Sequence, residues 1–115
     1  MVTGATNGIG EITALELAKM GATVVIVARS KEKGERVQAE IKATTNNTNV
    51  DLMLADLSHM ADVRKLADEF NAKYDHLHVL VNNAGAFFTG YQQTEDGHEM
   101  TFGLNHLSYF LLTNL

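Results

Sequence analysis

The sequence contains no cysteine and no long hydrophobic run. Without cysteine the chain can form neither a disulfide framework nor a thiolate site, a composition that fits the reducing cytoplasm. No apolar stretch approaches the roughly 20 residues that cross a membrane. The opening MVTGATNGIG also lacks the basic flank and apolar core of a secretion signal. These absences predict a soluble, cytoplasmic protein with no membrane span.

Positive charge is scarce as well. Nine Lys and Arg stand against fourteen Asp and Glu, which gives a formal net charge of −5. Nucleic acids and anionic membranes are bound by basic surfaces, so this balance predicts neither as a partner. His76 and His78 lie two positions apart, but no acidic partner stands at a familiar ligand spacing. We therefore expect no metal site.

What is present is an ordinary globular pattern. At 115 residues, with 45% hydrophobic and 20% charged, the chain has the size of one domain or part of one. Short β-branched runs alternate with stretches of helical period. The expected strands are a stub at Met1–Val2, then Ala22–Ala28, Val50–Ala55 and Leu77–Val81. The expected helices are Ile9–Met20, Lys31–Ala43, His59–Tyr74 and a last helix from Thr94 or Glu95 to the end.

This alternation predicts an α/β fold. A β-α-β-α order gives a parallel sheet with right-handed crossovers and helices on both faces, here with about four strands. Ser30 and Ser58 are placed to cap the second and third helices, and Gly21 to end the first. Ile12, Leu15 and Ala18 recur at helical spacing along the first helix, and on the second helix we expect Val37 and Ile41 to face inward.

Both ends of the chain fall inside expected elements. Only Val2 separates Met1 from the first turn, and the terminal YFLLTNL has no Gly, Pro or basic residue to end its helix. We therefore expect a fragment whose uncovered apolar surface favours association into a homo-oligomer.

Three glycines stand between the first strand and the first helix. In TGATNGIG, Gly4, Gly8 and Gly10 form the spacing G-x-x-x-G-x-G. Such a turn lets the backbone approach a pyrophosphate more closely than a Cβ allows, and the helix behind it points N–H groups at the anion. The alternative is a tight turn that uses glycine only for its shape.

With three further motifs, this turn resembles the short-chain dehydrogenase/reductase family, whose turn reads T-G-x-x-x-G-I-G. The others are Asp56-Leu57 after the third strand, NNAG at Asn82–Gly85 after the fourth, and Asn105 in the last helix. The ending Thr94–Leu115 is similar to the retinol-dehydrogenase-like branch. The resemblance covers essentially the whole chain. It implies a doubly wound Rossmann-type sheet, with residues 1–115 as the N-terminal part of a domain that binds NAD or NADP and whose C-terminal catalytic part is absent.

The resemblance also implies which residues contact the cofactor. Asp56 would bond the adenine edge with the Leu57 backbone beside it, while small Ala84 and Gly85 would let the backbone approach a ribose. Alternatively, Asp56 only begins a loop and Asn82 only ties neighbouring strands. The implied cofactor-binding residues are Gly4, Asn7, Gly8, Ile9, Gly10, Arg29, Asp56, Leu57, Asn83, Ala84 and Gly85.

Arg29 decides between the two dinucleotides. In Rossmann folds an acid after the second strand bonds the 2′-OH of NAD, whereas an Arg accommodates the 2′-phosphate of NADP. No acid stands at Ala28, Arg29 or Ser30, and a guanidinium offers paired donors to a phosphate. We predict NADP as the cofactor, with NAD as the alternative; a solvated Arg29 without a ligand is the other interpretation.

The family's Tyr-x-x-x-Lys pair is missing. Four positions after Tyr74, Tyr91 and Tyr109 stand His78, Glu95 and Thr113, and no Lys follows Lys73. Of the family's catalytic set only Asn105 is present, which in relatives kinks its helix and positions a water leading to the Lys. Its alternative role is that of a polar residue on a partly buried helix face, and Tyr109 is expected to pack on the same helix.

Two hypotheses of function follow. The first is the N-terminal part of an oxidoreductase that moves hydride between NADP and a small alcohol or carbonyl. Phe87, Phe88 and Tyr91 would form an apolar wall, which hints at a hydrophobic substrate. The second is a non-catalytic dinucleotide-binding module, a sensor or scaffold. S-adenosylmethionine binding is disfavoured, because it normally needs an acid at the end of the second strand.

Overall fold

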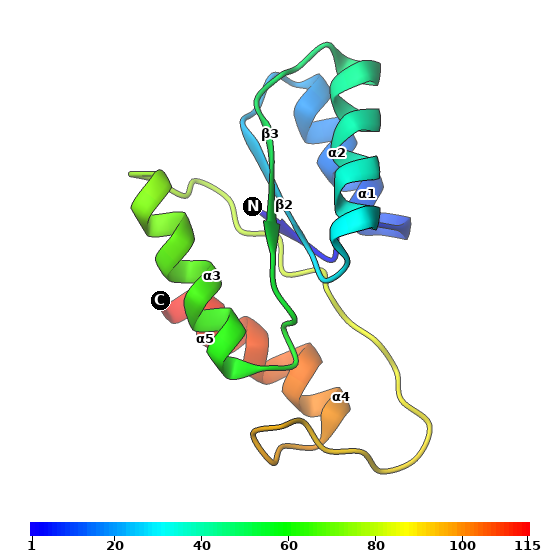
Figure 1. Ribbon diagram of the computed structural model, residues 1–115, viewed down its shortest axis with the longest axis vertical. Coiled ribbons are helices and arrows are strands. Elements are labelled where there is room, and N and C mark those ends of the chain that lie inside the picture. The colour runs from blue at the N-terminus through cyan, green and yellow to red at the C-terminus, as the bar shows by residue number, and fades with distance from the viewer. The chain divides into compact units, whose positions relative to one another are not determined.

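The computed structural model describes all residues, 1–115. The chain forms two compact units, Met1–Leu54 with Val79–Asn83 and Ala55–His78 with Ala84–Leu115. The first unit contains the parallel sheet and two helices, and the second contains the remaining helices (Figure 1).

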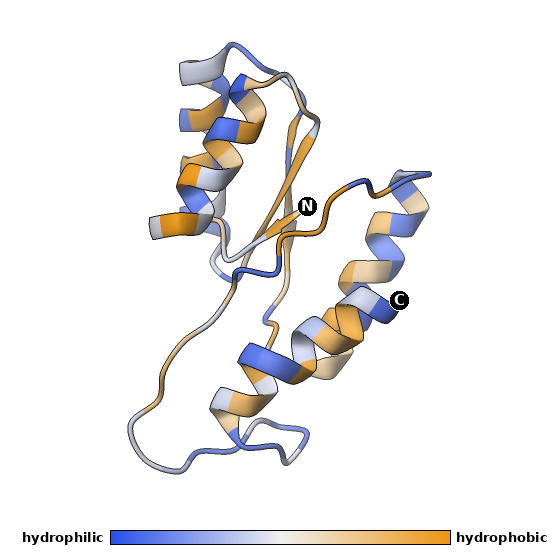
Figure 2. Cartoon of the chain, turned by 180° about the vertical axis from the view of Figure 1, so that it is seen from behind, coloured by the Kyte–Doolittle hydropathy of each residue, from blue (hydrophilic) through white to orange (hydrophobic).

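The sheet consists of three parallel strands, β1 (Val2–Thr3), β2 (Val24–Ala28) and β3 (Val50–Leu54), in the order β1-β2-β3. Every residue of β2 is buried, as expected of a continuous β-branched run between two parallel neighbours. The strands are coloured hydrophobic along nearly their whole length, whereas the helices alternate (Figure 2). The predicted α/β fold is confirmed.

The prediction of a fourth strand over Leu77–Val81 is wrong in length, because only one residue of this segment pairs with the sheet. Val81 forms only an isolated parallel bridge, to Val2. Its N–H donates to the Met1 carbonyl at 2.8 Å, and its carbonyl accepts from the Thr3 N–H at 3.0 Å. A strand needs a ladder of bonds, and β1 offers only two residues to pair with. The pairing still places this segment beside β1, and the resulting order β3-β2-β1-Val81 is that of the Rossmann sheet.

Helices α1 (Gly8–Lys19) and α2 (Lys31–Thr45) lie side by side against the sheet (Figure 1). On α2 the predicted Val37 and Ile41 are buried. On α1 the inward face consists of small residues at a spacing of four, Gly10, Ala14 and Ala18. Of the apolar residues at helical spacing, Ala18 is buried, whereas Ile12 points outward and is 57% exposed, because α1 packs along its small-residue face.

The ends of these helices follow their local sequence. Gly21 lies just beyond α1 at φ +83°, a conformation that costs glycine nothing. The Ser30 hydroxyl accepts from the Lys33 N–H, which confirms the predicted cap of α2.

In the second unit, α3 (Met60–Lys73) packs against α5 (Ser108–Asn114). The buried face of α3 consists of Val63, Leu66, Ala67 and Phe70. The expected cap at Ser58 is wrong: His59 is the N-cap, and the Ser58 hydroxyl donates instead to Asp56. No helix of the structure is long and apolar enough to cross a membrane.

The last helix begins later than expected. It runs through α4 (Met100–Phe102), the π-helical η1 (Gly103–Leu107) and α5. The prediction of a start at Thr94 or Glu95 is wrong, because the Glu99 carboxylate caps the helix by accepting from the N–H groups of Thr101 and Phe102 at 2.9 and 2.8 Å. These two bonds hold the pKa of Glu99 below its usual value.

Candidate functional site

The glycine-rich turn connects β1 to α1, and its glycines are needed for two different reasons. Gly4 and Gly8 have φ values of +63° and +53°, the left-handed region that favours glycine. Gly10 is needed for space, since a Cβ there would lie 2.4 Å from the Gly4 carbonyl oxygen and 2.4 Å from Asn83 Nδ2. No side chain fits at Gly10 without displacing the backbone of the turn.

Asn83 holds this turn in place. Its Nδ2 donates to the carbonyls of Thr3 and Gly4 at 3.0 and 3.2 Å, and its backbone N–H donates to the Thr3 hydroxyl at 3.0 Å. The Thr3 hydroxyl in turn donates to the Val81 carbonyl at 3.2 Å. The structure thus places the Asn83 side chain beside Gly4 and Gly10. Thr3, whose only sequence signal is the T that opens the turn motif, belongs to the same network.

The N-terminus of α1 faces solvent. Its N-cap Asn7 has an extended backbone and makes no side-chain capping bond. Asn7, Gly8 and Ile9 are all exposed. The first N–H groups of a helix lack partners within the helix and carry its positive dipole end, which suits an anion.

Arg29 leaves the sheet at the same edge as the turn. Thr3 pairs with Val27 in the parallel register, so the carboxyl ends of β1 and β2 lie together, and Arg29 follows β2 directly. Its side chain is exposed. Two lysines of the first turn of α2 follow it, of which Lys31 lies 3.7 Å from Glu35. This edge therefore offers helix N–H groups and a guanidinium, the donors that phosphates require.

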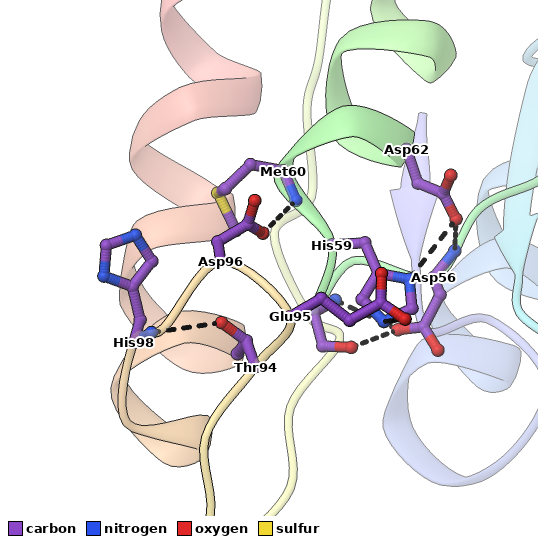
Figure 3. Close-up of polar contacts among 9 residues, drawn as sticks. Asp56, His59, Met60, Asp62, Thr94, Glu95, Asp96 and His98 are labelled. Carbon is purple, nitrogen blue, oxygen red and sulfur yellow. Dashed lines mark hydrogen bonds and ion pairs between the residues drawn. The ribbon is translucent and has the colours of Figure 1, made fainter.

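In the second unit, Asp56 lies in the loop before α3 (Figure 3). Its Oδ1 accepts from the Ser58 N–H at 3.0 Å and from the Ser58 hydroxyl at 2.7 Å. Its own N–H donates to Asp62 Oδ2 at 3.2 Å. Leu57 is buried beside it. The sequence analysis did not identify Ser58 and Asp62 as partners of Asp56. The only sequence signal for this contact is that Asp62 is an acidic residue six positions after Asp56.

The Ala84–Ala86 segment is tied to the last helix. The Asn105 side chain accepts from the Ala86 N–H at 3.0 Å and donates to the Ala86 carbonyl at 2.9 Å. A Cβ at Gly85 would lie 3.1 Å from Asn105 Oδ1, so the glycine leaves room for this clamp. Asn105 sits in the π-helical η1, a distortion frequent at functional sites.

Tyr109 adds a further tie, because its hydroxyl donates to the Ala84 carbonyl. Burial raises the pKa of the phenol, which keeps it protonated and able to donate. Tyr109 therefore positions the Ala84 segment.

Replacing Asn105 with Ala should loosen that segment. Both ends of the amide serve Ala86, so we expect the Ala86 N–H to exchange with solvent about tenfold faster, the equivalent of one hydrogen bond of roughly 1.4 kcal/mol. Hydrogen exchange followed by NMR measures this rate. Asn114→Ala is the control, since Asn114 donates only to the Phe110 carbonyl of its own helix. Unchanged Ala86 exchange would contradict the clamp.

The aromatic residues of the expected apolar wall lie mostly at the surface of the chain. Phe87 and Tyr91 are 84% and 75% exposed, and only Phe88 is half-buried. The segment that carries them has no regular secondary structure to pack them together.

The whole chain, residues 1–115, matches the family model for short chain dehydrogenases. Human retinol dehydrogenase 11 is 50% identical over all 115 residues, which cover 36% of that protein. Human polyprenol dehydrogenase is 44% identical, with 100% of the chain and 35% of that protein covered. The chain thus spans about a third of the length of these curated relatives.

Solved structures agree with these sequence matches. A short-chain dehydrogenase from Sphingobium yanoikuyae in complex with NADPH is 30% identical, with a TM-score of 0.83 over 98% of the chain and 44% of that structure. A metagenomic short-chain oxidoreductase in complex with NADP is 33% identical, with a TM-score of 0.84 over 98% of the chain and 52% of that structure. The chain therefore belongs to the short-chain dehydrogenase family.

Proposed function

We propose that this chain is the NADP-binding part of an oxidoreductase that moves hydride between the dinucleotide and an alcohol or carbonyl. The observation that carries the proposal is the packing of Gly10. The turn closes on the Gly4 carbonyl and the Asn83 amide with no space for a Cβ, directly before an exposed helix N-terminus. A turn of this kind suits the close approach of a pyrophosphate.

Each part of the dinucleotide has matching residues. The turn, with Asn7, Gly8 and Ile9 at the start of α1, receives the pyrophosphate. Asp56 and the Leu57 backbone receive the adenine edge. Ala84 and Gly85 present backbone to a ribose, in a segment that Tyr109 holds at Ala84 and Asn105 holds at Ala86. Asn83 acts through the turn, because its side chain holds the carbonyls of Thr3 and Gly4.

NADP is favoured over NAD by the end of β2. The exposed Arg29 stands where a carboxylate would bond the 2′-OH of NAD, and no acid occupies positions 28–30. The two solved structures named above contain NADPH and NADP, which supports the same choice.

When bound, the nicotinamide supplies the hydride chemistry, and the residues of this chain bind and orient it. Asn105 is a positioning residue in this proposal, because its amide serves the Ala84–Ala86 segment. For the longer protein we propose a hydrophobic alcohol as substrate. Retinol and polyprenol, in the names of two relatives, are both apolar alcohols.

For the 115-residue chain we expect dinucleotide binding without turnover. No Tyr is followed four positions later by Lys, so the general acid–base contribution, about 10²–10⁴-fold, is missing. NADP should raise the melting temperature, because a ligand that binds only the folded state stabilises it. NADPH oxidation with a panel of aldehydes and ketones should stay at the rate without protein.

Oxidation above that rate would contradict the expected inactivity. Absence of any thermal shift at millimolar NADP would instead contradict the binding proposal. A non-catalytic dinucleotide-binding module is the second candidate, since within these 115 residues no Tyr is followed four positions later by Lys. Reading the coding DNA past Leu115 separates the two: a Ser and a Tyr-x-x-x-Lys segment select the enzyme, and a stop codon selects the module.

A further inference from the structure

The loop before α3 holds Asp56 from two sides. Ser58 donates both its N–H and its hydroxyl to Asp56 Oδ1, at 3.0 and 2.7 Å. Asp62 Oδ2 accepts the Asp56 N–H at 3.2 Å from the first turn of α3. Figure 3 shows Asp62 directed at the Asp56 backbone from the helix end. Main chain and side chain of Asp56 are therefore fixed by different residues.

This arrangement is anchored to the helix start. His59 Nδ1 lies 4.0 Å from Asp62 Oδ2, and its Nε2 lies 3.8 Å from Glu95 Oε1. Asp96 Oδ2 accepts the Met60 N–H at 2.9 Å, so a side chain 36 positions away caps the first turn of α3. The turn that bears Asp62 is thus itself held, and Asp62 can set the direction of the Asp56 backbone.

A fixed carboxylate can distinguish bases. A carboxylate offers about four acceptor positions, and the two bonds from Ser58 use one oxygen while setting the plane of the group. The exocyclic amino group of adenine donates hydrogen bonds, whereas hypoxanthine presents a carbonyl oxygen at the same position. A carboxylate oriented toward that position attracts the first and repels the second.

We propose that Ser58 and Asp62 are positioning residues that orient Asp56 toward the amino group of adenine, and that they thereby set the base selectivity of the site. The inference rests on the proposed function, in which Asp56 meets the adenine edge. It adds two residues that touch Asp56 and not the ligand.

The test compares NADP with its hypoxanthine analogue, nicotinamide hypoxanthine dinucleotide phosphate, by the ratio of their dissociation constants on the 115-residue chain. The unmodified chain should prefer NADP by about ten- to a hundredfold, the range of one charge-assisted hydrogen bond. Ser58→Ala and Asp62→Ala should each reduce that preference several-fold, chiefly by weakening NADP. Asp62→Asn keeps an oxygen that can accept the Asp56 N–H, so this variant should retain most of the preference for NADP over the hypoxanthine analogue.

Asp68→Ala is the matched control, because Asp68 is exposed on the same helix. It should leave the ratio unchanged. If Ser58→Ala and Asp62→Ala both bind the two dinucleotides in the ratio of the unmodified chain while Asp56→Ala lowers that ratio, Ser58 and Asp62 do not position Asp56. Equal weakening of both dinucleotides by Ser58→Ala and Asp62→Ala would show a structural role only and would also overturn the inference. If the unmodified, folded chain binds neither dinucleotide, the proposed function itself falls.

Discussion

Gly10→Ala is expected to destabilise the protein severely and to abolish dinucleotide binding. The new Cβ would meet the Gly4 carbonyl oxygen and Asn83 Nδ2 at 2.4 Å, and one of these contacts is rigid backbone. Overpacking costs about 1–3 kcal/mol, and each displaced Asn83 hydrogen bond adds about 1 kcal/mol. A total near 3 kcal/mol lowers the melting temperature of a domain of this size by about 12–24 °C. Thermal unfolding followed by circular dichroism measures it.

The control for this variant is Gly21→Ala, at the end of α1. Gly21 has φ +83° and nothing within 4 Å of a Cβ, so the substitution strains only the backbone, at about 1–2 kcal/mol. It should lower the melting temperature modestly and leave dinucleotide affinity unchanged. A Gly10→Ala chain with the melting temperature and dinucleotide affinity of the unmodified chain would contradict the predicted clash of a Cβ at this position.

The sheet and its helices were largely predictable, because their signals are local. Four of the five β2 residues are β-branched, and Ser30 and Gly21 mark helix ends by their own chemistry. The sequence alone does not show which face of α1 is buried, because the helix has apolar residues on two faces. Only the packed structure reveals that the small residues Gly10, Ala14 and Ala18 form the contact face, leaving Ile12 exposed.

The sequence suggests which residues belong to the candidate site, but it does not show the hydrogen bonds among them. The glycine-rich turn and Arg29 each directly follow a strand, and in that position their chemistry suggests phosphate binding from the sequence alone. The bonds of Asn83 to Thr3 and Gly4 join residues about 80 positions apart, and the bond of Asp62 to the Asp56 N–H depends on the course of a loop. Neither leaves a periodic pattern. For the same reason Ser58, a good helix cap by its chemistry, serves Asp56 instead.

Arg29→Ala is expected to weaken NADP binding by about ten- to a hundredfold, while NAD affinity stays nearly constant. In the proposed complex the guanidinium would make a charge-assisted contact of roughly 1.5–3 kcal/mol with the 2′-phosphate, a group that NAD lacks. Calorimetric titration at fixed salt gives the ratio of the two dissociation constants. Arg64→Ala is the matched control, since Arg64 is another exposed arginine, on α3.

An acid introduced in place of Arg29 should then shift the preference toward NAD. Arg29→Asp offers an acceptor to the 2′-OH and repels the 2′-phosphate. The exposed position 29 tolerates a carboxylate, whereas Ala28, 3% exposed, would bury it. Should Arg29→Ala weaken both dinucleotides equally, Arg29 serves the fold, and the choice of NADP falls with it.

The central claim is that this chain itself holds NADP. A calorimetric titration of NADP into the 115-residue chain, shown to be folded by its NMR spectrum, tests that claim most directly. We expect heat that saturates at one NADP per chain and disappears in a chain carrying Arg29→Ala and Gly10→Ala. A folded chain that gives no saturable heat at millimolar NADP would contradict it.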